Sequence, residues 1–474
     1  MIATGWLALA LYCYPGFMSF DSFEALAQAR DLMPMSDWHP PILALTWRPL
    51  DAVLPGPWLV VMLQSGLLLG GIYAVLARTL RPLGAALVTL AIGLWPPVLT
   101  LMAVVWKDSL MAGVLVASYA ALTSTHPRAR IAALAGLLYA ALLRHNAIVA
   151  IAPLLILLSP WPARRGRWTQ RAIGLALAFA VLLSAQLINR MLIETRTYPF
   201  VHSIPTYDIA GTLRYAAPLS DEQIAELLPG VPLVVQTGIQ ARAKSAWVPE
   251  GWFSVAIGEG RLMDRPATAA QRDAVLSAWL RLIREHPGPY LRARLRVFRE
   301  LIGLPLRERP RWHIYNAIAE DHALLAGYGI DFERPPWQLR WSFWFADVSR
   351  SALIFRAWPY LLVAIALAIT LRRNRGAIAI VASGLCYETA LFVIAPSADF
   401  RYSTWLVIST LIGFALRFSQ RVETRAGSNS CSSSANRATP SPSVGANVCI
   451  YVTNPTRDEF VLEGRRATEH KYAP

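Results

Sequence analysis

The first loop of the chain, residues 20–57, is the stretch around which the other polar segments are organised. It opens with Phe20-Asp21-Ser22-Phe23-Glu24 and contains Asp37-Trp38-His39-Pro40-Pro41. The loop follows directly on an apolar segment, so we expect it where the chain leaves a membrane. Acidic, basic and aromatic side chains stand close together in it, ahead of a Pro-Pro pair. The other unusual polar segments are expected on the same side of the membrane.

The composition excludes a soluble protein. Hydrophobic residues make up 55% of the 474 residues and charged residues only 16%, whereas a soluble domain is about 25% charged. The net charge of +15 comes mostly from short arginine clusters between apolar runs, which is typical of topology anchors rather than of a nucleic-acid surface. Four scattered cysteines indicate neither a zinc site nor a disulfide framework. The sequence predicts an all-α polytopic membrane protein.

Apolar runs of about 15 to 22 residues predict about ten transmembrane helices. They are expected near 3–19, 58–77, 83–103, 109–123, 131–143, 147–159, 172–191, 352–371, 376–395 and 402–416. We expect the first to be an uncleaved span rather than a signal peptide. The pair 131–143 and 147–159 is short for two crossings, so one kinked span or a re-entrant pair remains an alternative.

Charge sorts the connections into two sides. Five arginine-rich loops fall on one side by strict alternation, which the positive-inside rule makes cytoplasmic. They contain Arg78/Arg81, Arg128/Arg130, Arg164/Arg165/Arg167/Arg171, Arg372/Arg373/Arg375 and Arg417/Arg421/Arg425. The opposite loops are then expected to face the periplasm, from a bacterial inner membrane. They are 20–57, Trp106-Lys107-Asp108, Arg144-His145-Asn146, 192–351 and 397–402.

Four parts follow from this topology: an N-terminal transmembrane half at 1–191, a periplasmic α-rich segment at 192–351, C-terminal transmembrane helices at 352–417 and a disordered cytoplasmic tail at 418–474. Within the periplasmic segment, 276–302 has the pattern of a basic amphipathic helix in the headgroup layer, interrupted at His286-Pro287-Gly288-Pro289. Its apolar face is predicted to hold Leu291, Leu295, Phe298 and Ile302.

The first loop offers acid–base candidates. Asp21 and Glu24 lie three residues apart and share a helix face. A carboxylate beside the membrane gains proton affinity unless it is paired, which suits a general base. The alternative is a solvated helix start with a favourable N-terminal charge. His39 is suited to phosphate contact or proton relay, and Trp38 to a sugar ring or, alternatively, to an interfacial anchor.

Three later loops supply cations. Lys107 is the only lysine in the spanning half, and a compact ammonium suits a phosphate bound as a point charge; a neutral pair with Asp108 is the alternative. Arg144, His145 and Asn146 interrupt an apolar stretch. They are expected to line a water-filled cavity; a plain polar turn between two short helices is the alternative. Asp399, Arg401 and Tyr402 precede the last span, where Arg401 is suited to clamp a phosphate; an ordinary outer loop is the alternative. Tyr207-Asp208 and His286-Pro287 are weaker candidates.

The order of these segments resembles the GT-C superfamily of polytopic glycosyltransferases, related to protein O-mannosyltransferases and lipid A aminoarabinose transferases. The resemblance covers residues 1–417 and rests on Asp21 after the first span, Trp38-His39-Pro40-Pro41, Trp106-Lys107-Asp108, Arg144-His145-Asn146 and Asp399-Phe400-Arg401-Tyr402. Many members carry two acids spaced D-x-D or E-x-D after the first span, whereas Ser22-Phe23 separates the two acids here.

The resemblance implies an inverting transfer at the periplasmic face from a polyprenyl-phosphate-linked sugar to a glycan, lipid or protein acceptor. It implies that Asp21 is the catalytic base, that His39 and the Pro pair are positioning elements, and that Lys107, Arg144 and Arg401 contact the lipid-linked phosphate. Membrane lipid is the other expected partner. The expectation includes no cofactor and no nucleic acid, and it assigns no metal ligand.

Two other function classes remain open on sequence grounds. A transporter or lipid flippase needs polar groups at mid-membrane depth, and Glu388, flanked by Tyr387 and Thr389, is the main such group in the predicted spans. A non-catalytic polytopic scaffold would lose little when Asp21 becomes asparagine.

Overall fold

The computed structural model of the chain describes residues 1–158, 166–304, 327–329 and 334–435, the last sixteen of these as backbone. By contacts the chain divides into two units, Met1–Val422 and Glu423–Pro474. Arg164 and Arg165 of one predicted cytoplasmic loop, part of the 192–351 segment and the tail beyond Ala435 lie outside the described residues. The predicted boundaries inside the first unit stay predictions.

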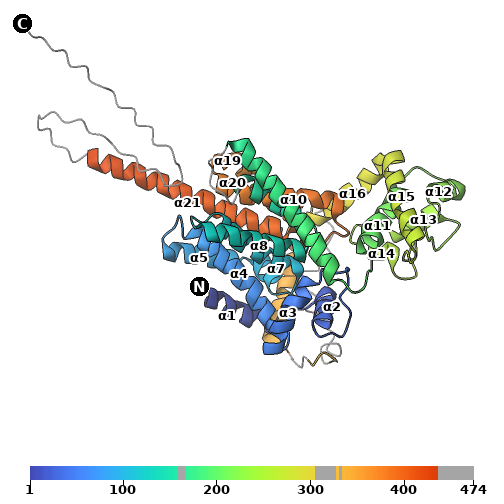
Figure 1. The fold of residues 1–474 in the computed structure, drawn as a ribbon, viewed down its shortest axis with the longest axis horizontal. Coiled ribbons are helices and arrows are strands. Elements are labelled where there is room, and N and C mark those ends of the chain that lie inside the picture. Colours follow the sequence, from blue (N-terminus) through green and yellow to red (C-terminus); the bar gives the residue numbers. More distant parts are fainter. Residues whose placement is uncertain (159–165, 305–326, 330–333, 436–474) are drawn as a thin grey trace, which may run out of the picture. The chain divides into compact units, whose positions relative to one another are not determined.

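Every regular element in the described part is a helix (Figure 1). The first group is α1 (Ile2–Cys13), α2 (Phe20–Ala29), α3 (Ile42–Val53), α4 (Trp58–Leu76), α5 (Pro82–Gly93), α6 (Pro96–Met102), α7 (Lys107–Leu122), α8 (Pro127–Leu143), α9 (Ala147–Leu158) and α10 (Arg167–Leu192). Next come α11 (Pro199–Tyr215), α12 (Asp221–Leu227), α13 (Ile239–Ala246), α14 (Phe253–Ala256), α15 (Ala269–Glu285), α16 (Pro287–Leu301) and α18 (Pro336–Ser351). The last are η1 (Leu353–Phe355), α19 (Ala357–Thr370), α20 (Arg375–Ile394), η2 (Phe400–Ser403) and α21 (Thr404–Ala435).

Within the part of the chain that the structure describes, three helices are long and apolar enough to cross a membrane, namely α4, α10 and α20. The bent pair of α5 and α6 makes a fourth if it is one span, and α1, α9 and α19 are shorter apolar helices. The all-helical, membrane-associated class predicted from the sequence is therefore seen in the described residues, with three or four candidate spans. The remaining crossings of the ten-span topology stay a prediction.

The structure bends the predicted span at 83–103. Helix α5 ends at Gly93, and α6 begins at Pro96 after a bend of 73°. Pro96 and Pro97 supply no backbone N–H, and their rings clash with the preceding turn of a continuing helix, so they fit only the first turn of a new one.

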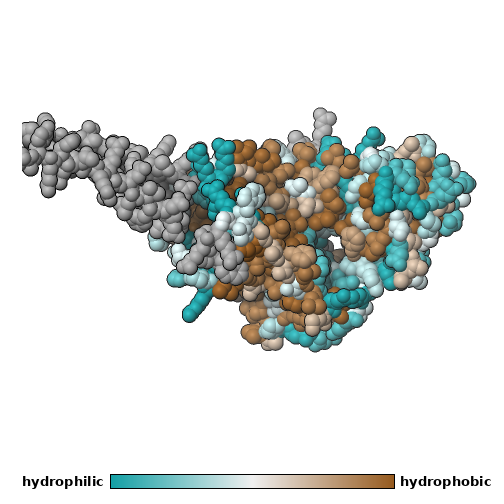
Figure 2. Space-filling model, turned by 45° about the horizontal axis from the view of Figure 1, so that its top comes forward, coloured by the Kyte–Doolittle hydropathy of each residue, from teal (hydrophilic) through white to brown (hydrophobic). Residues whose placement is uncertain are grey.

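Helix α10 presents an apolar face outward. A stripe of side chains spaced four residues apart is about half or more exposed: Leu175, Phe179, Leu183, Leu187 and Met191. Figure 2 shows a broad hydrophobic surface on the described part of the molecule, with hydrophilic side chains gathered around its margins. Exposed apolar surface of this extent suits contact with lipid rather than with water.

Small residues let α4 and α7 approach each other closely. A Cβ atom built on Gly113 of α7 would lie 2.5 Å from the Gln64 carbonyl oxygen of α4. A Cβ on Gly71 of α4 would lie 2.9 Å from the Ala117 backbone nitrogen. Close backbone approach through small residues is the usual way in which helices associate within membranes. This contact fixes α7, whose first residue is Lys107.

Helices α11 to α16 form a group in which α11 contacts α13, α14, α15 and α16 (Figure 1). The predicted interruption at His286 is confirmed, since α15 ends at Glu285 and α16 starts at Pro287. The predicted apolar face of α16 is divided: Leu291 and Leu295 are half exposed, whereas Ile302, just beyond the helix, is buried. The position of this helix in a headgroup layer stays a prediction.

Helix α21 continues to Ala435, so the predicted disorder from 418 differs from the structure over 418–435. The physical reason is that an apolar helix is already nucleated at Thr404, and elongation costs far less than nucleation.

Replacing Gly113 with alanine is predicted to destabilise the α4–α7 contact, because the new methyl group meets a backbone carbonyl that cannot rotate away. We expect a cost of about 1–3 kcal/mol, read as a lower midpoint of heat unfolding in detergent. Gly84→Ala is the control, since a Cβ atom at that position would have no heavy atom of another residue within 4 Å. Equal midpoints for the two variants would contradict the close packing.

Candidate functional site

Side chains from four loops of the sequence meet in one polar cluster. We define the polar cluster as Asp21, Glu24, His39, Lys107, Asp108, Arg144, Asp399 and Arg401, which direct contacts link into two groups, one around Arg401 and His39 and one around Arg144. Chain continuity joins the groups at Lys107 and Asp108. The sequence predicted these residues one by one, and the structure brings them together. Their chemical roles stay predictions.

Helix α2 sets the position of Asp21. Its N-cap, Ser19, exchanges hydrogen bonds with Ser22 in a capping box. The Ser22 hydroxyl donates to the Val105 carbonyl at 2.6 Å, and the Trp106 indole donates to the Ser19 hydroxyl at 2.8 Å. These bonds fasten the start of α2 to the residues just before Lys107, so Asp21 faces the start of α7.

Arg401 lies between two carboxylates. Its guanidinium is 2.8 Å from Asp21 and 2.9 Å from Asp399. The rings of Trp106 and Tyr402 each lie 5.3 Å from it, which adds cation–π attraction. Burial by itself would raise the pKa of Asp21, but the neighbouring positive groups, Arg401 foremost and Lys107 with it, together hold this pKa well below its usual range. Asp21 is therefore a carboxylate that protonates poorly while Arg401 contacts it.

His39 links Lys107 to the acids of α2. The Lys107 ammonium donates to Nδ1 of His39 at 2.6 Å. An ammonium has no acceptor, so Nδ1 accepts and the neutral ring carries its proton on Nε2. That nitrogen lies 3.6 Å from Asp21 and 3.6 Å from Glu24. Burial and the charge of Lys107 lower the pKa of His39 to about 3, so the ring stays uncharged at neutral pH.

Lys107 and Glu24 have shifted proton affinities. Burial lowers the pKa of Lys107 to about 8, although the charge of Asp21 opposes the shift. Burial and the charge of Asp21 raise the pKa of Glu24. Glu24 accepts a weak hydrogen bond from Ser36 at 3.4 Å. The two acids of α2 are thus held in different states: Asp21 is fixed as an anion, and Glu24 takes up a proton more readily.

Arg144 pairs with Asp108 in the second group of the cluster. Its guanidinium is 2.7 Å from Asp108, whose side chain is 1% exposed, and lies 4.9 Å from the Tyr402 ring. Asn146 donates to the Tyr387 hydroxyl at 3.2 Å. His145 is exposed, and among the described residues no hydrogen bond or ion pair joins it to the cluster. The Lys107–Asp108 neutral pair considered from the sequence is not formed, because Asp108 pairs with Arg144.

Helix α20 supports both arginine-bearing loops. Tyr387 receives the bond from Asn146, and the next residue, Glu388, accepts a hydrogen bond from Ser403 at 2.8 Å. Ser403 ends the 3-10 turn that carries Arg401. Sequence reasoning selected Glu388 as an isolated charge within a span and missed Ser403, because a serine gives no signal until its partner is known.

The ring of Trp38 contacts residues outside the polar cluster. Its ring is 5.5 Å from the Trp252 ring and 5.5 Å from the Arg265 guanidinium. Its neighbour Asp37 accepts hydrogen bonds from the backbone N–H of Thr197 and, at 3.2 Å, of Tyr198. The loop that bears His39 is therefore tied to the start of the 192–351 segment. Substrate binding by Trp38 stays a prediction.

The weaker candidates hold the α11–α16 group together. Asp208 pairs with Arg294 at 2.6 Å, with both side chains almost fully buried, and it accepts a bond from Trp279 at 2.9 Å. Arg294 also donates to the Ala395 carbonyl at 2.7 Å. This contact connects the group to the segment that leads to Arg401. His286 marks the break between α15 and α16.

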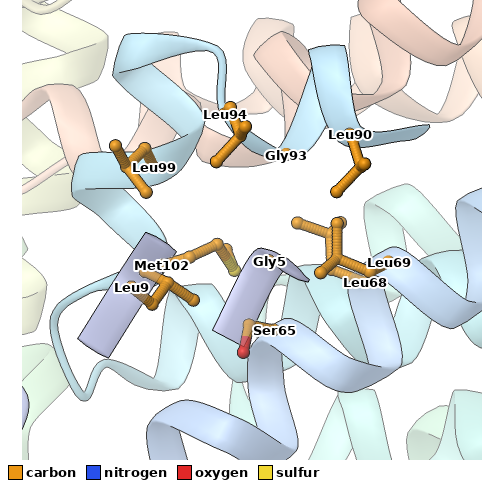
Figure 3. A pocket seen from close by; sticks show the side chains of 10 residues that line it. All are labelled: Gly5, Leu9, Ser65, Leu68, Leu69, Leu90, Gly93, Leu94, Leu99 and Met102. Atoms are coloured by element: carbon orange, nitrogen blue, oxygen red, sulfur yellow. The ribbon is translucent and has the colours of Figure 1, made fainter. Parts of the chain in front are cut away.

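An apolar hollow lies among α1, α4, α5 and α6. Figure 3 shows its lining, which is formed by Gly5, Leu9, Ser65, Leu68, Leu69, Leu90, Gly93, Leu94, Leu99 and Met102. Its volume of about 10 Å³ is at the lower limit for holding a single water molecule, and its lining contains none of the polar cluster. We assign it no role.

Among the described residues, no group of three or more histidine, cysteine or acidic side chains has the geometry of a metal site. Comparison with protein-family models, curated proteins and solved structures finds no match to this chain.

Asp108→Asn is predicted to destabilise the protein, because it leaves the buried Arg144 charge without its partner. We expect a loss of about 3–5 kcal/mol, measured as a lower heat-unfolding midpoint. Asp31→Asn is the control: Asp31 pairs with Arg48 on the surface, where its side chain is 77% exposed, and such pairs contribute up to about 1 kcal/mol. A loss no larger than the control's would show that Arg144 does not depend on Asp108.

Proposed function

We propose that the protein is a membrane glycosyltransferase that moves a sugar from a polyprenyl-phosphate donor to an acceptor, with inversion at the anomeric carbon. The ten-span GT-C-like topology and the periplasmic orientation of the cluster belong to this proposal. The observation that carries it is the meeting of Asp21, His39, Lys107 and Arg401 in one partly open cluster. These are the positions at which the GT-C resemblance places a base and the contacts to a lipid-linked phosphate.

The cations of the cluster suit a phosphate. Arg401 has planar N–H donors that match phosphate oxygens, and 15% of its side chain is exposed. Lys107 donates to an uncharged imidazole, so this contact leaves the ammonium charge uncancelled. Arg144, which is held by Asp108, adds positive electrostatic potential to the cluster. In the proposal these three side chains stabilise the charge that builds on the departing polyprenyl phosphate.

The base in this proposal is Asp21, and Arg401 controls it. An arriving phosphate competes with Asp21 for the Arg401 guanidinium. As the ion pair weakens, the proton affinity of Asp21 rises, so the carboxylate becomes a competent base only when the donor is bound. Asp399 and the Trp106 ring still hold Arg401 during this exchange. His39 keeps its Nε2 proton directed between Asp21 and Glu24.

The proposed step is a single displacement. The acceptor nucleophile forms a bond to the anomeric carbon while the bond from that carbon to the phosphate oxygen breaks. The nucleophile's proton passes to Asp21, and the electron pair of the broken bond stays on the polyprenyl phosphate. No covalent enzyme intermediate is needed.

The transporter or flippase alternative rests on Glu388. This residue is fully buried in α20, and its bond to Ser403 ties it to the turn that carries Arg401. We therefore interpret Glu388 as a support of the cluster. The alternative remains an outcome of the experiment below.

Transfer is measured in proteoliposomes with radiolabelled polyprenyl-phosphate sugars. Asp21→Asn is expected to lower transfer by about 10²–10⁴-fold, because it removes the general base. Glu24→Gln is expected to lower it less. Asp31→Asn is the matched control in the same loop, with an exposed carboxylate, and should transfer like wild type.

Three results decide between interpretations of that experiment. Loss in Glu24→Gln together with activity in Asp21→Asn would make Glu24 the base. Wild-type protein that transfers from no donor but moves a lipid or solute across the bilayer would replace the enzyme proposal with transport. Full activity of both variants would indicate a scaffold in which neither acid reacts.

Donor binding is predicted to weaken as the pH rises through about 8, the pKa of Lys107, because the ammonium loses its charge. The arginines stay charged over this range, and so does the donor phosphodiester. Affinity for the polyprenyl-phosphate sugar should therefore fall above this pH in wild type and stay constant in Lys107→Arg. Lys244→Arg, at an exposed position on α13, should retain the wild-type fall. A fall in Lys107→Arg equal to wild type would contradict the assignment.

A further inference from the structure

Helix α18 carries an aromatic stripe that the polar cluster does not use. Trp337, Trp341 and Trp344 lie at i, i+4 and i+7, on one face of the helix. Their exposed fractions are 43%, 52% and 52%. Three half-exposed tryptophans on one helix face form an exposed apolar patch of the kind that marks an interaction surface.

The other sides of α18 differ in character. Gln338, Ser342 and Phe345 are buried and face the rest of the molecule. Arg340 and Asp347 are exposed and flank the stripe on the side away from the buried face. Around the helix axis, α18 thus presents in order a protein-packed face, a tryptophan face and a charged face that also exposes Phe343. A helix in the plane of a membrane surface has this order, with the tryptophan face toward lipid and the charged face toward water.

The contacts of α18 place it at the end of an apolar helix. Gln338 donates to the Ala10 carbonyl at 3.1 Å, in the last turn of α1, and the Phe345 ring is 5.1 Å from the Tyr12 ring. Just before α18, Arg334 donates to the Cys13 carbonyl at 2.9 Å. Helix α18 therefore crosses the end of α1 from which the chain leads to α2 and Asp21.

Helix α1 also exposes apolar side chains. Leu7 and Leu11 of α1 are 60% and 54% exposed, and Leu11 is adjacent to the Ala10 carbonyl that holds Gln338. If lipid covers these leucines, the end of α1 and the tryptophans of α18 lie near the membrane–water interface. Indole rings concentrate at this depth in membranes.

We propose that α18 lies in the headgroup layer of the membrane, with Trp337, Trp341 and Trp344 against phospholipid. The partner is the bilayer itself. The surface is separate from the glycosyltransferase proposal, since it requires no donor, acceptor or reaction.

The test measures membrane depth along α18. Trp341→Cys, Trp344→Cys, Arg340→Cys and Asp347→Cys are each introduced into the full chain with its native cysteines replaced, labelled with a nitroxide and reconstituted into phosphatidylethanolamine–phosphatidylglycerol vesicles. Collision of each label with oxygen, which concentrates in lipid, is compared with collision with a water-soluble nickel complex. Labels at 341 and 344 should favour oxygen, and those at 340 and 347 should favour nickel.

Two results would overturn the proposal. Four labels that all favour nickel would place α18 in water. Labels at 341 and 344 shielded from both reagents would show that protein covers the stripe. Because replacing the buried Cys13 risks misfolding, a second measurement keeps the native cysteines: replacing Trp341 and Trp344 with phenylalanine should lower the share of tryptophan fluorescence that bromine-labelled phospholipid quenches. An unchanged share would also overturn the proposal.

Discussion

The ion pair between Arg401 and Asp21 is the contact on which the rest of the polar cluster depends. It joins residues 380 positions apart in the chain, one from the helix after the first apolar segment and one from the turn before α21. A charged group beside a membrane is stable only when a partner compensates it. Asp399 and Trp106 compensate Arg401 from its other sides, so the guanidinium has a fixed position whether or not Asp21 contacts it.

The surrounding structure holds the ends of this pair in register. On one side, the capping box of α2 and the bond from Ser22 to Val105 fix Asp21 against the start of α7. On the other side, α20 supports the Arg401 turn through Glu388 and Ser403. The close packing of α4 on α7 at Gly113 fixes the position of α7, and with it the position of Lys107, relative to α4. The cluster is thus placed by packed helices rather than by its own loops.

Proton affinity separates side chains that look alike in the sequence. Asp21 and Glu24 are two acids on one helix, yet Arg401 keeps the first ionised, and burial favours protonation of the second. Lys107 and His39 share a hydrogen bond, and the charge of the lysine keeps the imidazole neutral. A cluster of this kind can bind an anion and accept a proton at neighbouring positions, which is the combination that the proposed transfer of a sugar from a departing phosphate requires.

The sequence by itself determined the helical membrane class and most of the polar cluster, because apolar run length, arginine distribution and isolated polar segments are local properties. His39, Lys107 and Arg144 were found in this way. Tertiary structure alone decided which residues pair. Asp108 could contact its neighbour Lys107, but it holds Arg144; Trp38 is adjacent to His39, but its ring contacts Trp252 instead. The break before Pro96 and the tryptophan face of α18 also became clear only in the fold. Pairing depends on the distances between packed helices, and spacing along one chain does not encode those distances.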